Sequence, residues 1–336
     1  MFDSPLPCKT SSGDTLRVKD LESYASDWLL DGEIAHHSPK TIENRRLYVK
    51  NLLWFLKRQG YEYVGTHELK QFIRYFHTGH TEEGGRWGSP QEKTAVKPST
   101  VATYHRHIRA LFRWLVAGEY LTTSPMEKVP APIDRPDEVQ PFTEEHIQAL
   151  VRVAQESLNP LRDTALILLL LDTGMRLTEL CTLRLKDIDL PRGTAQVLGK
   201  GNKTRSIFIG KKTIQALREY LRREEREEDD CLFYSKRGEP LTQTGVQQLI
   251  DRLGEVAEIR GVRCSPHTFR HTFAVTFLRN GGNQFTLQKL LGHNDLRMTS
   301  RYVSLAQADL EKQHRAFSPV DCMKKIPLKR LKGKGI

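Results

Sequence analysis

The chain has 336 residues, 38% of them hydrophobic and 28% charged, which is enough for packed cores and long enough for two domains. Its net charge of +11 favours a polyanionic partner, and nucleic acid more than a membrane surface. The alternative is a soluble basic protein without such a partner. The five cysteines are scattered, which argues against a disulfide framework and a zinc motif. The sequence has no apolar run long enough to cross a membrane and no signal-peptide pattern, so we predict a cytoplasmic location.

Residues 1–125 predict a bundle of four helices, spanning about 16–30, 39–59, 66–76 and 99–117. Each helix has apolar residues at helical spacing and polar residues on its other face. The start and stop signals that we assign are Ser38 with Pro39, Thr66 and Ser99 at the beginnings, and Gly60 and Gly118 at the ends.

The fourth of these helices carries a basic stripe opposite its apolar stripe. The basic stripe consists of His105, Arg106, His107, Arg109 and Arg113. A helix of this kind can pack against its neighbours on one side and face DNA phosphates on the other. We therefore predict that Arg106, Arg109 and Arg113 bind DNA, with an ordinary solvated helix face as the alternative.

Two segments without regular structure interrupt these patterns. Residues 78–97 are rich in glycine and long for a connection within a bundle, so we expect them to be either mobile or functional. Residues 126–141 are rich in proline and predict a semi-rigid linker between domains. A second domain is expected over 142–318, followed by a basic tail at 319–336 that could touch phosphates non-specifically.

The second domain reads as mostly helical with a small β-hairpin. Helices are predicted at 143–156, 161–171, 177–183, 212–226 and 244–257, and again between 267 and 302. The run from Arg222 to Asp230 reads as a solvated helix end. Strands at 194–198 and 204–209 flank a turn that contains Gly199, Gly201 and Asn202, and a further short strand is predicted at 231–234.

Several residues in this domain suit phosphodiester chemistry that uses a tyrosine nucleophile and no metal. Two arginines, Arg176 and Arg270, could stabilise the extra negative charge of the transition state. Lys200 at the hairpin tip could protonate the leaving oxygen, and Tyr302 could attack the phosphorus. Taken singly, each residue also has an ordinary interpretation. Tyr302 could be a packing residue, Lys200 a solvated turn lysine, and Arg176 an ion-pair partner of Glu179.

Three motifs in this order identify a resemblance to the tyrosine recombinases, also called the phage integrase family. Residues 173–180 read Thr-Gly-Met-Arg-Leu-Thr-Glu-Leu, which resembles the first arginine box of that family. Residues 199–205 read Gly-Lys-Gly-Asn-Lys-Thr-Arg, which resembles its hairpin lysine motif. The second box is matched by His-Thr-Phe-Arg-His at 267–271, Leu-Leu-Gly-His at 290–293, and Tyr302.

The resemblance implies a helical core-binding (SAM-like) domain followed by an α+β catalytic domain. It implies that the catalytic set is Arg176, Lys200, His267, Arg270, His293 and Tyr302, with Glu179 as a supporting residue behind the arginine. We expect His271 to be structural, and we predict Lys203 and Arg205 to bind DNA.

The family resemblance also implies the course of the reaction. One strand of each of two double-stranded sites is cut through a 3′-phosphotyrosine, and strands are exchanged through a Holliday junction in a homotetramer, without a cofactor or metal. Residues 305–316 resemble the segment that protomers exchange. The biological role is open between a mobile element and chromosome-dimer resolution. The rival functions are a DNA-relaxing topoisomerase with the same chemistry and a non-cleaving DNA-binding regulator with this fold.

Overall fold

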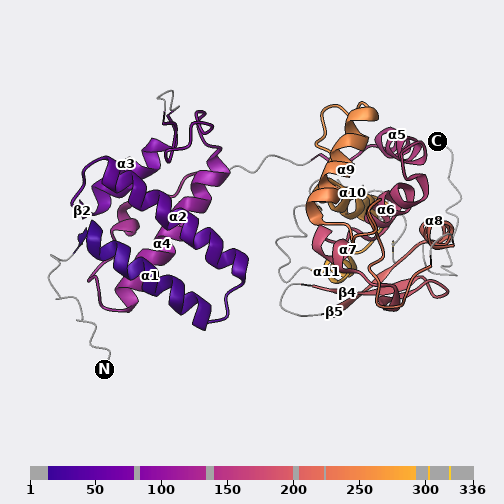
Figure 1. The fold of residues 1–336 in the computed structure, drawn as a ribbon, viewed down its shortest axis with the longest axis horizontal. Helices are drawn as coiled ribbons and strands as arrows, with labels where there is room; N and C mark the ends of the chain where they lie inside the picture. The colour runs from indigo at the N-terminus through magenta and orange to yellow at the C-terminus, as the bar shows by residue number, and fades with distance from the viewer. Residues whose placement is uncertain are drawn as a thin grey trace, which may run out of the picture. The chain divides into compact units, whose positions relative to one another are not determined.

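The computed structural model describes residues 14–78, 84–133, 140–199, 204–222, 225–292, 302 and 318. The chain forms two compact units, Met1–Asp137 and Glu138–Ile336 (Figure 1). Both units are mostly helical, and each contains a small antiparallel sheet, so the predicted fold class is confirmed. Among the helices of the described ranges, none is both long enough and apolar enough to cross a membrane. The predicted exchange segment at 305–316 and the tail at 319–336 lie outside the described residues.

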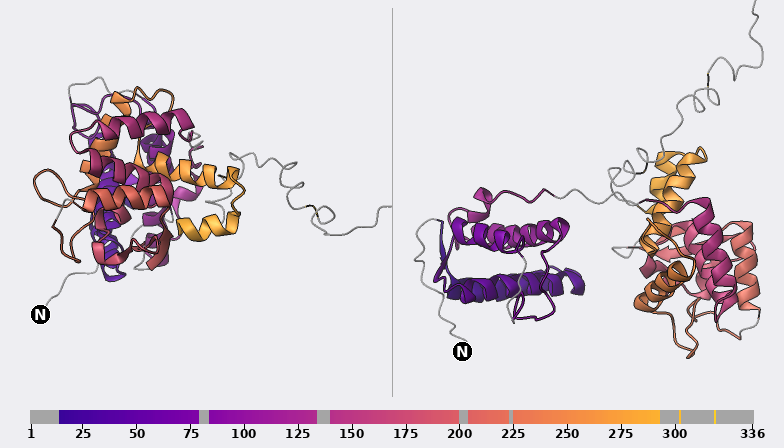
Figure 2. Two further views of the ribbon diagram at one scale, coloured as in Figure 1. Left: turned by 90° about the vertical axis from the view of Figure 1, so that its right-hand side faces the viewer. Right: turned by 90° about the horizontal axis from the view of Figure 1, so that it is seen from above.

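The first unit is a bundle of four helices with a minimal sheet. Helices α1 and α2 lie side by side, and α4 packs against both (Figures 1 and 2). Strands β1 and β2 pair in antiparallel fashion. The elements are β1 (Leu16–Arg17), α1 (Val18–Ile34), α2 (Pro39–Arg58), β2 (Tyr63–Val64), α3 (Thr66–Tyr75), α4 (Pro98–Ala117) and the 3₁₀ helix η1 (Pro125–Lys128).

The signals predicted around α2 are confirmed. The Ser38 hydroxyl accepts a hydrogen bond from the Thr41 amide at 3.2 Å, and Pro39 occupies the first helical position. Gly60, just beyond the helix, has a φ of 70°, which is the left-handed conformation that glycine adopts without strain.

Two other predicted caps are wrong, each by a small shift. The N-cap of α3 is Gly65 rather than Thr66, and the Glu68 carboxylate accepts from the Gly65 amide at 2.8 Å. Helix α4 begins at Pro98, so Ser99 lies inside its first turn. Proline has no amide hydrogen to satisfy and its fixed φ suits the first helical position, so it starts the helix before a serine cap is needed.

Part of the long connection between α3 and α4 packs on the core: of its described residues 84–97, Gly85 and Arg86 are buried, Trp87 is half-buried and residues 91–95 are exposed. The Trp87 ring lies against the rings of Phe72, Phe76 and Tyr104, with centroids 5.5–6.1 Å apart. The buried Arg86 guanidinium donates to the carbonyl oxygen of Thr94. Trp87 has a φ of 59°, a conformation that a bulky residue adopts only where its surroundings hold it. Here the aromatic cluster does so.

Replacing Trp87 by alanine should therefore lower the free energy of unfolding of the first unit by about 3 kcal/mol, because it leaves a void among packed rings. The measurement is urea unfolding followed by circular dichroism. As a control, Leu47→Ala on the exposed face of α2 should change stability by less than about 0.5 kcal/mol. A Trp87→Ala variant as stable as the control would show that this connection does not pack on the core in solution.

The beginning of the predicted linker belongs to the core of the first unit. Met126 and Val129 are buried with the helices of the bundle. The Val129 carbonyl lies 3.1 Å from Nε2 of His105, whose ring is buried as well. The assignment of His105 to the basic face of α4 is therefore wrong. The sequence pattern misplaced it because a histidine can occupy an apolar face when its ring nitrogen finds a backbone partner.

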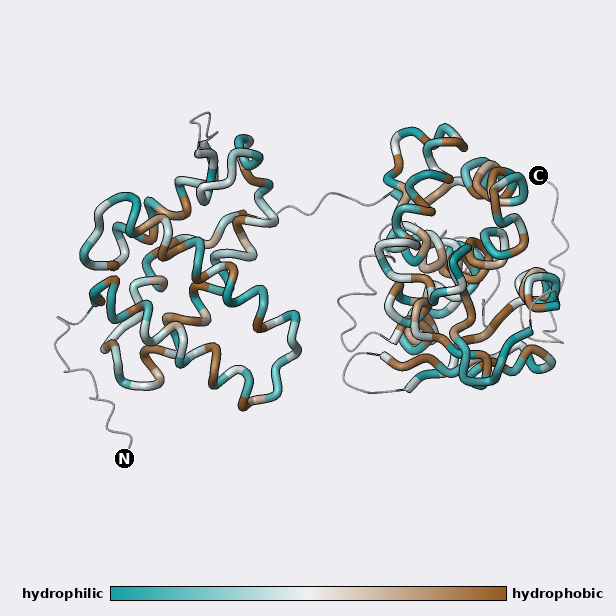
Figure 3. Tube along the Cα trace, in the orientation of Figure 1, coloured by the Kyte–Doolittle hydropathy of each residue, from teal (hydrophilic) through white to brown (hydrophobic). Residues whose placement is uncertain are grey.

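The second unit surrounds one apolar helix. Helix α6 packs against α5, α8 and α10, and its residues between 165 and 170 are largely buried. Figure 3 shows hydrophobic segments running through this unit. Strands β3, β4 and β5 form an antiparallel sheet in that order. The elements are α5 (Glu144–Gln155), α6 (Pro160–Thr173), α7 (Leu177–Thr182), η2 (Leu185–Asp187), β3 (Ile188–Asp189), β4 (Thr194–Leu198), β5 (Thr204–Phe208), α8 (Lys211–Leu221), α9 (Gln243–Val256), α10 (Pro266–Arg279) and α11 (Gln284–Leu291).

The predicted strand at 231–234 is not formed. Cys231 makes a single bridge to Arg184, and Tyr234 makes a single bridge to Pro240. Leu232 is buried, and its amide donates to the Leu183 carbonyl at 2.7 Å. The apolar pattern of this segment therefore reflects burial of an extended chain, because the described segments beside it pair with it only through single bridges.

Candidate active site

The first arginine box lies at a sharp turn between two helices. Helix α6 ends at Thr173; Gly174, its C-cap, has a φ of 56° that reverses the chain, and α7 begins two residues beyond Met175. A Cβ atom on Gly174 would lie 2.5 Å from the Phe273 ring, so only glycine fits here. Arg176 is the N-cap residue of α7, and this position directs its side chain out of the helix.

The second arginine comes from the interior of α10. Ser265 caps this helix, accepting from the Thr268 amide at 3.3 Å. Arg270 is only 6% exposed, and its two terminal nitrogens donate to the carbonyls of Gly174 and Leu291, both at 2.8 Å. Arg270 thereby connects the turn of the first box to the end of α11.

The end of α11 receives three guanidinium groups. Arg176 donates to the Gly292 carbonyl at 3.0 Å, and Arg270 donates to the Leu291 carbonyl. Arg205, on β5, donates to the Leu290 carbonyl. The last carbonyls of a helix have no partner within the helix and carry the negative end of its dipole, so they attract cations. We call Arg176, Arg205 and Arg270 the arginine cluster.

One buried carboxylate serves two members of the cluster. The Glu179 side chain is fully buried; one of its oxygens accepts from the Arg176 guanidinium and the other from the Arg176 amide, both at 2.8 Å. The Arg205 guanidinium donates to the Glu179 carboxylate at 2.7 Å. The predicted pairing of Arg176 with Glu179 is thus present, although Arg205 shares the carboxylate.

Tyr302 packs beside this cluster. It is 7% exposed and lies in an apolar group with Leu287, Leu291 and residues of α10. Its ring meets the buried His271 ring edge-on, with centroids 5.0 Å apart. Leu291 of this apolar group also accepts the hydrogen bond from Arg270, and His271 follows Arg270 in α10, so the Tyr302 ring lies beside Arg270.

The electrostatics of the cluster leave it cationic. Burial lowers the pKa of Arg270 to about 10; the charge of Arg176 contributes to this fall and Tyr302 opposes it. Burial also lowers the pKa of Arg205, an effect that Glu179 opposes. Among the described residues, Glu179 is the carboxylate bonded to this cluster, and it pairs with two of the three guanidinium groups. A net positive charge therefore remains, which suits an anionic ligand such as a phosphate.

The structure brings together some of the predicted site residues and not others. Arg176, Glu179, Arg270 and Tyr302 lie together. His267 is exposed on the first turn of the same helix as Arg270. Lys200, Lys203 and His293 lie outside the described residues.

The predicted DNA contacts of the first unit are all on α4. Arg106 and Arg113 are exposed there, and Arg109 is half-buried. Arg205, by contrast, was predicted to bind DNA but has only 12% of its side chain exposed and points into the arginine cluster. No pattern in the sequence signalled that direction, because alternation along β5 does not say which neighbouring helix covers the strand.

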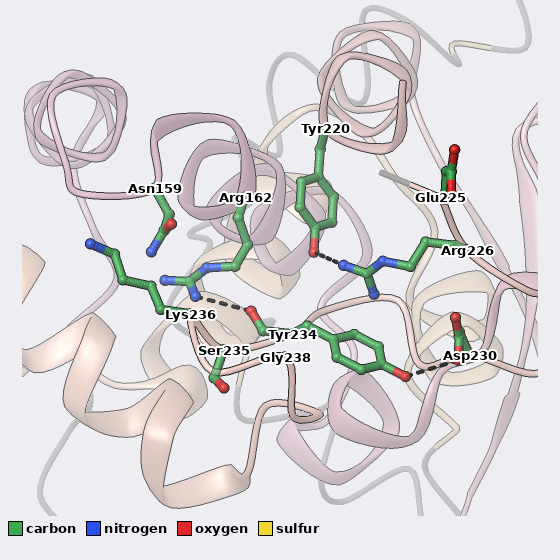
Figure 4. Close-up of a pocket in the computed structure, with 10 residues that line it drawn as sticks. All are labelled: Asn159, Arg162, Tyr220, Glu225, Arg226, Asp230, Tyr234, Ser235, Lys236 and Gly238. Carbon is green, nitrogen blue, oxygen red and sulfur yellow. Dashed lines mark hydrogen bonds between the residues drawn. The ribbon is translucent and has the colours of Figure 1, made fainter. Parts of the chain in front are cut away.

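A second group of arginines in the same unit lines a cavity of about 520 Å³ (Figure 4). Arg226 lies over the Tyr234 ring at 4.0 Å and donates to the Tyr220 hydroxyl at 3.1 Å. Arg162 donates to the Tyr234 carbonyl, and the Tyr234 hydroxyl donates to Asp230. The charge run at 222–230, predicted to be solvated, therefore turns one arginine inward. These cations have carboxylate and aromatic partners, and we assign them a structural role.

Comparison with known proteins places this site in context. Residues 140–309 match the Phage integrase family. The tyrosine recombinase XerD of Listeria innocua is 30% identical over 68% of this chain and 78% of its own length. The tyrosine recombinase XerC of Halalkalibacterium halodurans is 29% identical over 84% of this chain and 93% of its own length.

Solved structures share the fold at lower sequence identity. XerH recombinase bound to a palindromic difH substrate, in a post-cleavage complex, has a TM-score of 0.66 and 19% identity, covering 90% of this chain and 85% of that chain. A lambda integrase dimer bound to a COC′ core site has a TM-score of 0.65 and 18% identity, covering 86% and 77%.

Proposed function

Because this chain belongs to the phage integrase family and is a tyrosine recombinase, we propose that it cleaves and rejoins DNA at specific double-stranded sites through a 3′-phosphotyrosine. The observation that carries the proposal is the juxtaposition of Tyr302 with the arginine cluster. A phenol beside buried, charged guanidinium groups is a nucleophile placed next to a phosphate-binding site.

The arginines have donors available for the phosphate. A guanidinium carries five N–H groups, and the described bonds use two of them in Arg270 and two in Arg176. Backbone carbonyls hold both guanidinium groups in place before DNA arrives, and Glu179 also holds that of Arg176. Fixed cations of this kind stabilise the charge that develops on the non-bridging oxygens without having to reorganise during the reaction.

In the proposed cleavage step, the Tyr302 oxygen forms a bond to phosphorus as the bond from phosphorus to the 5′ oxygen breaks. The phenolic proton passes to a base, for which His267 and His293 are the candidates. Lys200 gives a proton to the leaving 5′ oxygen. Attack by a 5′ hydroxyl on the phosphotyrosine reverses these steps and rejoins a strand, so that the bond energy is conserved and the exchange passes through a Holliday junction.

We propose that the partners are two DNA sites held by a homotetramer. The solved relatives XerH and lambda integrase are complexes with DNA, which supports the DNA partner. The similarity to proteins named XerC and XerD favours chromosome-dimer resolution, although integration or excision of a mobile element also fits the chemistry. The scattered cysteines keep the cytoplasm as our proposed location.

The test uses a duplex that the full chain selects from a random-sequence library. The duplex is nicked within the bound site, so that the short fragment is lost after cleavage and the covalent complex accumulates. A denaturant-resistant adduct is expected. Its absence would favour a non-cleaving regulator. Relaxation of a supercoiled plasmid without any second site, and without strand exchange between two sites, would instead indicate a topoisomerase.

The basic face of α4 should contribute to binding through phosphate contacts. Replacing the exposed Arg106 and Arg113 together by glutamine should reduce the slope of log affinity against log salt by about 2, since each lost phosphate contact reduces it by about 1. Fluorescence anisotropy of the selected duplex at several salt concentrations measures this slope. Lys70→Gln, an exposed cation on α3, is the matched control and should leave it unchanged. An unaltered slope in the double variant would remove α4 from the DNA interface.

A further inference from the structure

We infer that Arg205 is a positioning residue of the active site: from β5 it fixes Glu179 and the end of α11, and thereby the orientation of Arg176. The inference rests on the proposed function, because it concerns the reaction at Arg176. It also changes the role expected for Arg205, which the sequence suggested as a contact to DNA.

The first observation is the shared carboxylate. Glu179 has no exposed side-chain surface, and its only described cationic partners are Arg176 and Arg205. A buried carboxylate is stable only when its charge is compensated and its oxygens accept hydrogen bonds. Arg205 supplies a large part of that compensation at 2.7 Å. Glu179 can therefore hold the Arg176 guanidinium and amide in a single arrangement.

The second observation is the contact of Arg205 with the end of α11. Arg205 donates to the Leu290 carbonyl, next to the two carbonyls that Arg270 and Arg176 use. A Cβ atom on Gly292 would lie 2.8 Å from Cδ of Arg205 and 3.1 Å from its Nε. The Arg205 side chain thus lies directly against the left-handed glycine that ends α11, where φ is 62°. Displacing Arg205 would free the helix end that also anchors the other two arginines.

The third observation is the position of Arg205 in the sheet. It pairs with Val197 on β4, one residue from the end of the ladder at Leu198 and Thr204. In the sequence, Lys200 falls in the connection between these two strands. Arg205 therefore joins the β4–β5 sheet to Glu179 of the first arginine box. With 12% of its side chain exposed, it has little surface left for a phosphate of DNA.

A positioning role and a DNA contact predict different results for Arg205→Met. If Arg205 positions Arg176, the affinity for the selected duplex and its salt slope stay as in the unaltered chain. Single-turnover cleavage of the nicked duplex falls by about 10²-fold, the scale for displacing a catalytic group by about 1 Å through a change elsewhere. A lysine in Arg205→Lys keeps the charge but cannot donate equally well to the Glu179 carboxylate and the Leu290 carbonyl. The cleavage rate of this variant should therefore lie between those of Arg205→Met and the unaltered chain.

A second substrate separates positioning from a general loss of structure. In a duplex with an uncharged methylphosphonate at the cleaved position, fewer cations are needed at the non-bridging atoms. The penalty of Arg205→Met should largely disappear there, in parallel with that of Arg176→Ala. The matched control is Arg192→Met. Arg192 belongs to the turn between β3 and β4, and 83% of its side chain is exposed. This variant should cleave both duplexes at the rate of the unaltered chain.

Three results would overturn the inference. Unchanged cleavage by Arg205→Met would show that Arg176 does not depend on Arg205. Weaker binding with a salt slope smaller by about 1 would make Arg205 a phosphate contact. Equal losses on both duplexes with a lowered melting temperature would make its role structural alone. An unaltered chain that forms no adduct with the selected nicked duplex would overturn the proposed function, and the inference would fall with it.

Discussion

The Tyr302→Phe variant is expected to lose the covalent protein–DNA adduct while keeping its affinity for DNA. Phenylalanine has no oxygen to attack phosphorus, and removing a nucleophile lowers the rate by about 10⁶-fold in a well-studied hydrolase. The ring would still pack against His271, Leu287 and Leu291, so the melting temperature should change little. Denaturing electrophoresis of the selected nicked duplex after incubation with the protein measures the adduct.

A second buried tyrosine in the same unit provides the control. The Tyr220 hydroxyl accepts a hydrogen bond from Arg226 at the second cavity, outside the arginine cluster, so Tyr220→Phe removes a comparable oxygen. This variant should form the adduct at the rate of the unaltered chain. If Tyr302→Phe retains an adduct that resists denaturant, another residue is the nucleophile and the assignment of Tyr302 is wrong.

The Arg270→Ala variant is expected to have the next largest effect, a fall in single-turnover cleavage of about 10³–10⁵-fold. This is the range found when an arginine that stabilises a phosphoryl-transfer transition state is removed. The pKa of Arg270, lowered to about 10 chiefly by burial, still leaves the group charged at neutral pH, so the charge is available to the phosphate. A methylphosphonate at the cleaved position should restore part of the lost rate, because the transition state then carries less negative charge.

Arg270 also has a structural part, which the same variant should reveal. Its removal leaves the buried carbonyls of Gly174 and Leu291 without their donors, at a cost of about 1–3 kcal/mol for each unsatisfied group. Urea unfolding measures this loss, and Arg279→Ala at the exposed end of α10 is the control for both measurements. If Arg270→Ala is equally inactive on charged and uncharged duplexes, its role is to hold the turn and the helix end rather than to stabilise the phosphate.

Local signals predicted much of the secondary structure. Ser38 with Pro39 begins a helix as expected, the helix predicted at 143–156 is observed at Glu144–Gln155, and strands β4 and β5 begin at the predicted residues. These signals act over a few residues, through side-chain caps and turn conformations, and are therefore visible in the sequence. The start of α4 was predicted wrongly because Pro98 takes the first helical position ahead of Ser99. The strand at 231–234 was predicted wrongly because its apolar residues are buried without forming a sheet.

The sequence by itself determined the chemistry that this protein can offer: two arginines, a tyrosine and their neighbours follow one another in the order of a family that the comparisons confirm. Only the tertiary structure decided how these groups are held. Arg205, Glu179 and the carbonyls of Leu290 to Gly292 meet from β5, α7 and α11. Such contacts depend on the packing of elements far apart in the chain, because a buried charge must pair with a group that this packing places next to it. Neither periodicity nor residue type encodes that choice locally, so Arg205 pointed inward where the sequence suggested DNA, and His105 turned from the basic face of α4 to the Val129 carbonyl.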